Sequence, residues 1–575
     1  MRKYKRPLWA AVAVAMAFAV AACGSSGSSS SATSSAASSS SSSSTTASGA
    51  SSGKTGGTAT VVEGTFPQSL DPSIDFTTQG GEVHWLTYLG PYSFAHASGN
   101  AGTAIIPSMA TALPTVSDGG KTYSFTLRSG LKYSDGTPVK ASDLTFAIER
   151  DLKLGWSAAS FLTSTIQGAS AYSKGTAKTI SGITTNDSTG KTTIHLVSPY
   201  GAFVDVLAVP GVSYLPPTTA MKPLPNSPPV GFGPYIIKNV QPNVGLDMVL
   251  NPNYSSQAIP GIPAGHMNVH VSVQSNTTTE ASDVLNNSAD VFDWGDTIPP
   301  ALVQQISGQS SRYKAWETNK TFYWFLNTTQ KPFTSLQARE AVQIATDRPA
   351  LARLGSGQLV PGCYLLPPQM AGHPGQPCPN PTGGTFDPNA APNLTEAKKL
   401  VQESGESGAA VTVWAENRQP RLQWAENYAA TLNAIGFKAT LKTIADADYF
   451  STIETLKNHP QTGFADWQQD FPNPTDFYQN LVDARAIVPV GNSNYEEVND
   501  PHIQSTLDSL YPVPGSQIST AASKWANLDY YVTQKAYVVP FGYLESPEFV
   551  SNRINFGTLV FSPLEGNDFS SLQLK

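Results

Sequence analysis

Three carboxylates, Asp466, Asp470 and Asp476, stand close together in a proline-rich segment and could carry out acid–base chemistry. A glycoside hydrolase needs two carboxyl groups that face each other across a cleft, ~5–10 Å apart. Closeness within one segment does not predict that geometry. The chain also lacks a His-Glu-x-x-His zinc helix and a serine-nucleophile elbow set between a strand and a helix. We therefore predict that the protein is not an enzyme, and an anchored hydrolase is the weakest alternative.

The spacing of histidines and cysteines does not favour a metal site. His266 and His270 are four residues apart, but their segment has the pattern of a turn that leads into a strand. Cys363 and Cys378 lie in a segment rich in Pro and Gly, with His373 alone between them. Outside the cytoplasm, two such cysteines are expected to form a disulfide. We predict this disulfide, no metal and no cofactor.

The N-terminus has the composition of an export signal. A compact basic head precedes the uncharged run Leu8–Ala22, which is shorter than the ~20 residues of a membrane-spanning helix. Residues 1–22 are therefore predicted to be a signal peptide. The sequence Val-Ala-Ala-Cys-Gly around Cys23 resembles a bacterial lipobox, which implies a lipid on Cys23 and anchoring to the outer face of the bacterial cell membrane. An ordinary signal peptide with an incidental cysteine is the alternative.

A low-complexity segment follows the cysteine. From Gly24 to Gly57 every residue is Gly, Ser, Ala or Thr except Lys54. Because no large apolar side chain can offset the entropy of ordering this backbone, residues 23–57 are predicted to form a disordered tether. Without residues 1–22, the formal charge changes from −7 to −11. That charge argues against nucleic acid as a partner.

The remaining body is long enough for two or more domains with large cores. Aromatic residues make up 10% and charged residues 13% of the chain, a composition that suits aromatic-lined cavities as well as ordinary cores. Hydrophobic periodicity predicts strands at 58–63, 123–127, 269–273, 321–326 and 436–441, and helices at 81–89, 337–346, 395–402 and 421–435. Strands and helices interleave without strict βαβ regularity, which predicts an α/β protein with more than one lobe.

One long block resembles a known family. Residues 117–139 read SDGGKTYSFTLRSGLKYSDGTPV and are similar to the signature DGKTYTFTLRKGVKFSDGTPV of solute-binding protein family 5, with one extra glycine. This family contains the dipeptide, oligopeptide and nickel binding proteins of ABC importers. Further matching blocks are LDP at 70–72, GFGPY at 231–235, NPNY at 251–254, ADVFD at 289–293, FLNT at 325–328 and WQQDFPNP at 467–474.

The resemblance implies a two-lobed, periplasmic-binding-protein-like α/β fold, in which two crossing hinge segments join the lobes and the ligand lies between them. Lobe I would comprise 58–312 and 546–575, with an inserted subdomain at 93–227. Lobe II would span 313–545. The protein would be a monomer that captures a small solute, most plausibly a short peptide, and delivers it to a membrane permease.

Asp470 is the strongest candidate for a ligand contact. In peptide-binding relatives, the Asp at this motif position holds the ammonium group of the peptide, a charge-assisted hydrogen bond that also rejects neutral analogues. Helix capping is the alternative role. Trp467, three residues earlier, is expected to form a cavity wall or to pack under the loop. Other aromatic residues expected near the cleft are Trp85, Phe232, Trp294, Tyr323 and Trp324.

Tyr323 and Trp324 are neighbours in a predicted strand, and successive side chains of a strand point to opposite faces. Only one of the two can therefore line the cleft. A carboxylate-binding arginine is also expected for a short peptide, yet surface solvation is the expected state of Arg418 and Arg421. An oligosaccharide or a nickel chelate is the alternative ligand, and a sensing or adhesive surface lipoprotein is the alternative role. Asp470 favours an amine-bearing ligand, because a sugar needs no buried counter-charge.

Overall fold

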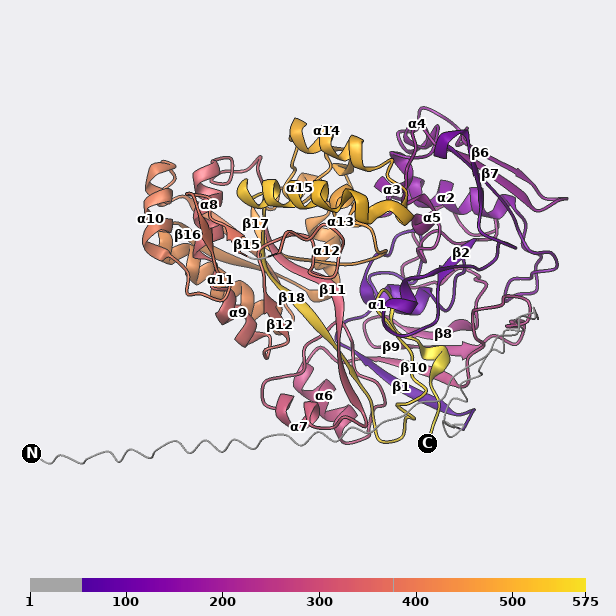
Figure 1. Cartoon of the computed structure of the whole chain (residues 1–575). Coiled ribbons are helices and arrows are strands. Elements are labelled where there is room, and N and C mark those ends of the chain that lie inside the picture. Colours follow the sequence, from indigo (N-terminus) through magenta and orange to yellow (C-terminus); the bar gives the residue numbers. More distant parts are fainter. Residues whose placement is uncertain (1–53, 376) are drawn as a thin grey trace, which may run out of the picture. The chain divides into compact units, whose positions relative to one another are not determined.

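The computed structural model describes residues 54–375 and 377–575 (Figure 1). The predicted signal peptide, the predicted lipid on Cys23 and most of the predicted tether lie outside these residues. The tether was predicted to extend to residue 57, and this boundary is wrong. Lys54 pairs with Leu574 in an antiparallel backbone bridge, and the Gly56 N–H donates to the His266 carbonyl at 2.7 Å. Such backbone hydrogen bonds need no apolar side chain, so composition alone placed the boundary too late.

The first sheet has four strands in the order β1 (Thr58–Glu63), β10 (Asn268–Val273), β9 (Gly245–Leu250) and β8 (Tyr235–Gln241). β1 is parallel to β10, and the other pairs are antiparallel. Alternate β-branched and apolar residues of these strands are buried, as expected for a sheet with one face on a core. The C-terminal tail returns here through the short hairpin β19 (Phe561–Ser562) and β20 (Gly566–Asn567).

The second sheet lies in the segment predicted to be an inserted subdomain. Its four antiparallel strands are β4 (Thr115–Ser117), β5 (Thr122–Thr126), β7 (Lys191–His195) and β6 (Ile183–Asn186). The β4–β5 turn contains Gly119 and Gly120 at φ 61° and 91°. Both glycines adopt left-handed conformations that other residues rarely take, so the extra glycine of the motif serves this turn.

The third sheet has six strands in the order β12 (Leu359–Pro361), β18 (Val538–Phe549), β11 (Tyr313–Leu326), β17 (Thr462–Gln468), β15 (Ala410–Glu416) and β16 (Lys438–Ile444). β15, β16 and β17 are parallel to one another, whereas β11 runs antiparallel to both β17 and β18. The short pairs β2 (Tyr92–Phe94) with β3 (Ile105–Pro107), and β13 (Cys378–Pro379) with β14 (Thr385–Phe386), complete the strands.

Helices surround these sheets. The N-terminal half contains α1 (Thr78–His84), α2 (Ser142–Leu154), α3 (Ser160–Thr163), α4 (Ala169–Ser173), α5 (Phe203–Val206), α6 (Thr277–Leu285) and α7 (Val303–Ser307). The C-terminal half contains α8 (Leu336–Ala345), α9 (Arg348–Leu354), α10 (Leu394–Glu403), α11 (Arg421–Ile435), α12 (Tyr449–Ile453), α13 (Thr475–Leu481), α14 (Pro501–Leu510) and α15 (Ala522–Gln534). None of the helices in the described part of the chain is long and apolar enough to cross a membrane.

Two long neighbouring strands, β11 and β18, connect the parts of the body. Figure 1 shows both running from α6 and α7 into the six-stranded sheet. At one end Tyr313 and Phe549 pack beside those helices, and at the other end residues 322–326 are buried in the core of the large sheet. The predicted lobe boundary at 545/546 therefore falls inside β18 rather than between elements.

A disulfide and a buried ion pair stabilise loops of this body. Cys363 and Cys378 form a disulfide with a Cα–Cα distance of 6.0 Å. The fully buried guanidinium of Arg150 in α2 makes bidentate hydrogen bonds of 2.5 and 2.6 Å to Asp71, which belongs to the LDP motif. Arg150 also donates to the carbonyl oxygens of Ala220 and Lys222. The pair thus fixes α2 against the corner that follows β1.

Replacement of Arg150 by Ala should lower the free energy of unfolding by about 3–5 kcal/mol, because it leaves the Asp71 carboxylate buried without its counter-charge. Urea titration followed by tryptophan fluorescence would measure this loss. Lys153→Ala, at an exposed position of the same helix, is the matched control and should change the value by less than about 0.5 kcal/mol. Equal effects of the two substitutions would contradict the role given to the pair.

Candidate ligand-binding cavity

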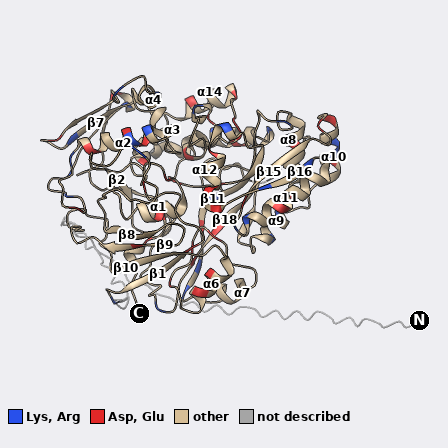
Figure 2. Ribbon diagram, turned by 180° about the vertical axis from the view of Figure 1, so that it is seen from behind, with Lys and Arg blue, Asp and Glu red and all other residues tan. Residues whose placement is uncertain are grey.

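A cavity of about 1190 Å³, including the space open to solvent at its mouth, lies among segments that are far apart in the sequence. Its lining comes from α1 and the loop before it, residues 209–211, β11, β17 and the loop after it, the β15–α11 region, residues 446–454 and the C-terminal tail at Leu564 and Glu565. In Figure 2, acidic positions gather between α12 and β11, beside this cavity. A hollow where aromatic and polar side chains from several segments converge is typical of a ligand-binding site.

Asp470 and Trp467 both line the cavity, and Asp476 sets their positions. Asp476, in the first turn of α13, accepts hydrogen bonds from the Trp467 indole N–H at 3.1 Å and from the Asp470 backbone N–H at 2.7 Å. With the loop held in this way, the buried Oδ2 of Asp470 has no hydrogen-bond partner. The Asp470 side chain caps no helix, since Pro474 occupies the N-cap position of α13.

Burial determines the protonation state of the two carboxyl groups, Asp470 and Asp476. Desolvation, followed by the charge of Asp476, raises the pKa of Asp470 well above its ordinary value. Desolvation also raises the pKa of Asp476 to about 7, even though hydrogen bonds from the Asp470 side chain and from the loop backbone and Trp467 favour its charged form. A carboxyl group held neutral in an apolar site becomes a strong acceptor once a cationic ligand arrives and replaces its proton.

Three cations line the cavity, and each already has a carboxylate partner. Lys320 of β11 lies 3.0 Å from Asp466, and Arg421 lies 2.8 Å from Glu416 and 3.3 Å from Asp466. The expectation that Arg418 and Arg421 are solvated at the surface is wrong, because they are only 2% and 5% exposed. Sequence alone did not reveal the buried carboxylates that compensate them.

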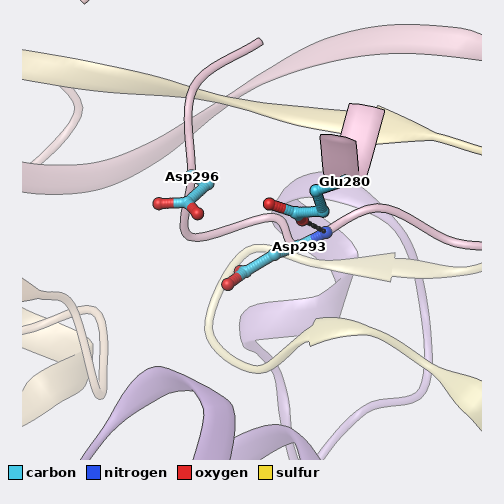
Figure 3. Close-up of side chains that lie close together, drawn as sticks. All are labelled: Glu280, Asp293 and Asp296. Carbon is cyan, nitrogen blue, oxygen red and sulfur yellow. Dashed lines mark hydrogen bonds between the residues drawn. The ribbon is translucent and has the colours of Figure 1, made fainter. Parts of the chain in front are cut away.

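Glu280, Asp293 and Asp296 form an acidic cluster (Figure 3). Arg418 contacts two members of this cluster. Its guanidinium is 3.0 Å from Asp293 and 2.8 Å from Asp296. Burial opposes ionisation of Asp293, but Arg418 and hydrogen bonds from Gln79 and two backbone N–H groups hold its pKa below the ordinary value. The Arg418 guanidinium supplies the positive charge that a bound cation would otherwise provide, so we assign no metal to this cluster.

Three other titratable groups of the lining are neutral or hydrogen-bonded within the protein. Asp75 accepts hydrogen bonds from the Ser69 and Thr77 backbone N–H groups, and burial raises its pKa to about 7. Burial also lowers the pKa of His84 to about 3, so this imidazole is neutral. Glu454 accepts a hydrogen bond of 2.9 Å from the Ser157 hydroxyl, and burial raises its pKa to about 7.

Most of the aromatic residues predicted for the cleft are core residues instead, which corrects that expectation. Trp85 stacks on His96 at 4.1 Å, Phe232 packs against Tyr254 and Trp294 packs against Phe561. Tyr323 and Trp324 are both fully buried, and Trp324 stacks on Tyr428 of α11 at 4.2 Å. Because both faces of β11 are covered here, alternation leaves neither residue in the cavity.

Apart from Trp467, the aromatic walls of the cavity come from residues that the sequence did not single out. Trp467 lines it together with Phe76, and their ring centroids are 5.7 Å apart. Phe450 and Tyr495 complete the aromatic lining. Phe76 follows the LDP corner by four positions, a place that only the folded structure brings next to β17.

These features define a class: a two-lobed α/β binding protein that encloses a small ligand among the segments between its sheets. The sequence model of bacterial extracellular solute-binding proteins, family 5, matches residues 104–487. The chain belongs to this family, whose members are binding proteins rather than enzymes, and the family prediction is confirmed.

Solved structures share the fold. OppA of Haemophilus influenzae in complex with RPPGFSPFR superposes with a TM-score of 0.74 at 18% identity, covering 90% of this chain and 98% of that one. Helicobacter pylori DppA in complex with the peptide STSA gives a TM-score of 0.75 at 18% identity, covering 91% and 98%. The predicted fold class is thereby confirmed.

A curated relative is more similar in sequence. The glutathione-binding protein GsiB of Escherichia coli strain K12 is 27% identical over 357 residues. The matched stretch covers 61% of this chain and 63% of the length of GsiB.

Buried carboxyl groups predict how stability depends on pH. Burial raises the pKa to about 7 or 8 for Asp75, Asp205, Glu416, Glu454, Asp476, Asp529, Glu548 and Glu565. Above about pH 4 the unfolded chain releases protons that the folded chain keeps. The ligand-free protein should therefore lose stability as the pH rises from about 4.5 to about 8. His84 and His373, whose pKa values burial lowers, oppose this trend near pH 6.

Thermal melting midpoints at pH 4.5, 6 and 7.5 and constant ionic strength would test this expectation. Glu548→Gln should flatten the slope, because it removes one titrating group while keeping an acceptor for the Trp316 indole N–H. A midpoint that climbs steadily across the range would contradict the raised pKa values.

Proposed function

We propose that this protein is the substrate-binding lipoprotein of an ABC importer, which captures a short peptide and delivers it to a membrane permease. The observation that carries the proposal is the orphaned Oδ2 of Asp470, a buried carboxylate oxygen beside a cavity of about 1190 Å³. Such an atom is costly in the empty protein. An ammonium group from the ligand would remove that cost by a charge-assisted hydrogen bond.

The surrounding groups favour a peptide over a sugar or a nickel chelate. The aromatic pair Trp467 and Phe76 supplies apolar wall for backbone and side chains. No histidine other than the neutral His84 lines the cavity among the described residues, which disfavours a metal chelate. The complexes of OppA with RPPGFSPFR and of DppA with STSA, and the name of the glutathione-binding relative, support the same ligand class.

The same arrangement argues against hydrolysis. Asp476 uses its oxygens to hold the Trp467 indole and the backbone of the Asp470 loop, and Asp466 is paired with Lys320 and Arg421. Neither carboxylate is free to serve as the second catalytic group. We propose a monomer tethered through a lipid on Cys23 to the outer face of the cell membrane, from which it reaches its permease.

Asp470→Asn should weaken binding of a free tripeptide such as Ala-Ala-Ala by about 100-fold, because the ammonium would lose its charged partner. N-acetylation of the peptide should weaken binding to the native protein to a similar degree. Isothermal titration calorimetry on protein that has been unfolded and refolded to remove carried-over ligand would measure both effects.

Asp205→Asn is the matched control, since Asp205 is a buried carboxyl with a raised pKa that does not line the cavity. It should bind Ala-Ala-Ala as the native protein does. Binding of oligosaccharides or nickel chelates without any binding of peptides would refute the peptide assignment and the role of Asp470.

A further inference from the structure

A second buried carboxylate lines the cavity without a partner. Glu565, in the C-terminal tail, is 7% exposed and makes no hydrogen bond or ion pair through its side chain with any described residue. Its Oε2 lies over Gly81 of α1, where a Cβ atom would come within 3.1 Å. The carboxylate is therefore held against a helix that also lines the cavity.

Asp470 and Glu565 belong to segments that are far apart in the sequence, and a hydrogen bond joins these two segments. The Gln468 side chain donates a hydrogen bond of 3.1 Å to the Pro563 carbonyl. Asp470 follows Gln468 by two residues, and Glu565 follows Pro563 by two residues. The two carboxylates are near enough for the charge of Glu565 to contribute to the raised pKa of Asp470.

The cations of the lining do not neutralise these two groups. Lys320, Arg418 and Arg421 are each paired with another carboxylate, at distances between 2.8 and 3.3 Å. Burial without a partner raises the pKa of Glu565 to about 8. An uncompensated buried carboxyl lowers stability, and a positively charged ligand group would relieve that penalty.

We propose that Asp470 and Glu565 together form a subsite for a doubly cationic ligand end, so that the protein prefers peptides whose first residue is Lys or Arg. This inference rests on the proposed peptide-binding function. Asp470 takes the α-ammonium group, and Glu565 takes the ammonium or guanidinium group of the first side chain. Phe76 and Trp467 line the same cavity and provide an apolar surface for the methylene groups of that side chain.

The test compares Lys-Ala-Ala with norleucine-Ala-Ala, which keeps the methylene chain of the first residue and lacks its charge. The purified native protein, refolded to remove carried-over ligand, should bind Lys-Ala-Ala at least ten times more tightly in calorimetry. Glu565→Gln should reduce this preference to less than threefold while leaving the affinity for norleucine-Ala-Ala unchanged. Asp470→Asn should weaken both peptides.

Glu548→Gln is the control, because Glu548 is buried, has a raised pKa and lies outside the cavity lining. It should retain the full preference for Lys-Ala-Ala. Ligand-free Glu565→Gln should melt at or above the temperature of the native protein, since the substitution removes an uncompensated buried acid. If this variant does not fold, Glu565→Asp, which withdraws the carboxylate by one methylene group, should show a reduced preference.

Three results would overturn the inference. Equal affinities of the native protein for the two peptides would refute the charge preference and leave peptide binding intact. An equal loss for both peptides in Glu565→Gln would show that the two carboxylates share one α-ammonium group. If the native protein bound neither peptide, the proposed function would fail together with this subsite.

Discussion

Burial of carboxylates next to the cavity is the constraint on which the rest of the structure depends. Each of these groups must find a cation or a set of N–H donors, or keep its proton. Asp466 and Glu416 are paired with Lys320 and Arg421, and Asp293 with Arg418. Asp470 has no such partner for its buried oxygen. The carboxylates beside the cavity thus fall into two kinds. Some are neutralised by cations of the protein and have a structural role, and others remain available to a ligand.

The structural pairs also hold distant segments of the chain together. Arg418, which follows β15, reaches Asp293 and Asp296, which belong to the segment between β10 and β11. On another side, Gln479 of α13 donates to the Ser160 carbonyl at 2.8 Å and the Ser157 hydroxyl donates to Glu454. Glu454 itself lines the cavity. Since α13 follows directly from the Asp470 loop, any shift at these contacts would move that carboxylate.

Local patterns predicted the elements of the fold well. The strand at 58–63 and the helix at 421–435 agree with the structure residue for residue. β-branched residues mark the strand, and the buried side chains of the helix recur every three or four residues. The helix predicted at 81–89 instead covers Thr78–His84, where Thr77 accepts the capping hydrogen bond from the Gly80 N–H. The lobe assignment came from family resemblance, since no local pattern shows that β11 and β18 are neighbours.

The site was predicted only where a motif carried it. Asp470 and Trp467 lie at the cavity because the motif around them fixes one loop. Trp85, Trp294, Phe232, Tyr323 and Trp324 are core residues, because an aromatic side chain packs equally well in a core and in a cleft wall. Sequence alone did not predict that Arg418, Arg421 and Glu565 line the cavity. Their burial depends on partners or neighbours from remote parts of the chain, which spacing along the sequence does not reveal.

The backbone bridge between Lys54 and Leu574 has a mechanical consequence. It joins the first described residue of the chain to the residue before the C-terminus, so both ends of the folded body emerge side by side. Tension transmitted along the N-terminal segment would load this bridge first and would peel it open before β1 is stretched. Once the bridge is open, the load would pass to the parallel pairing of β1 with β10, so the bridge sets the order in which the two connections yield.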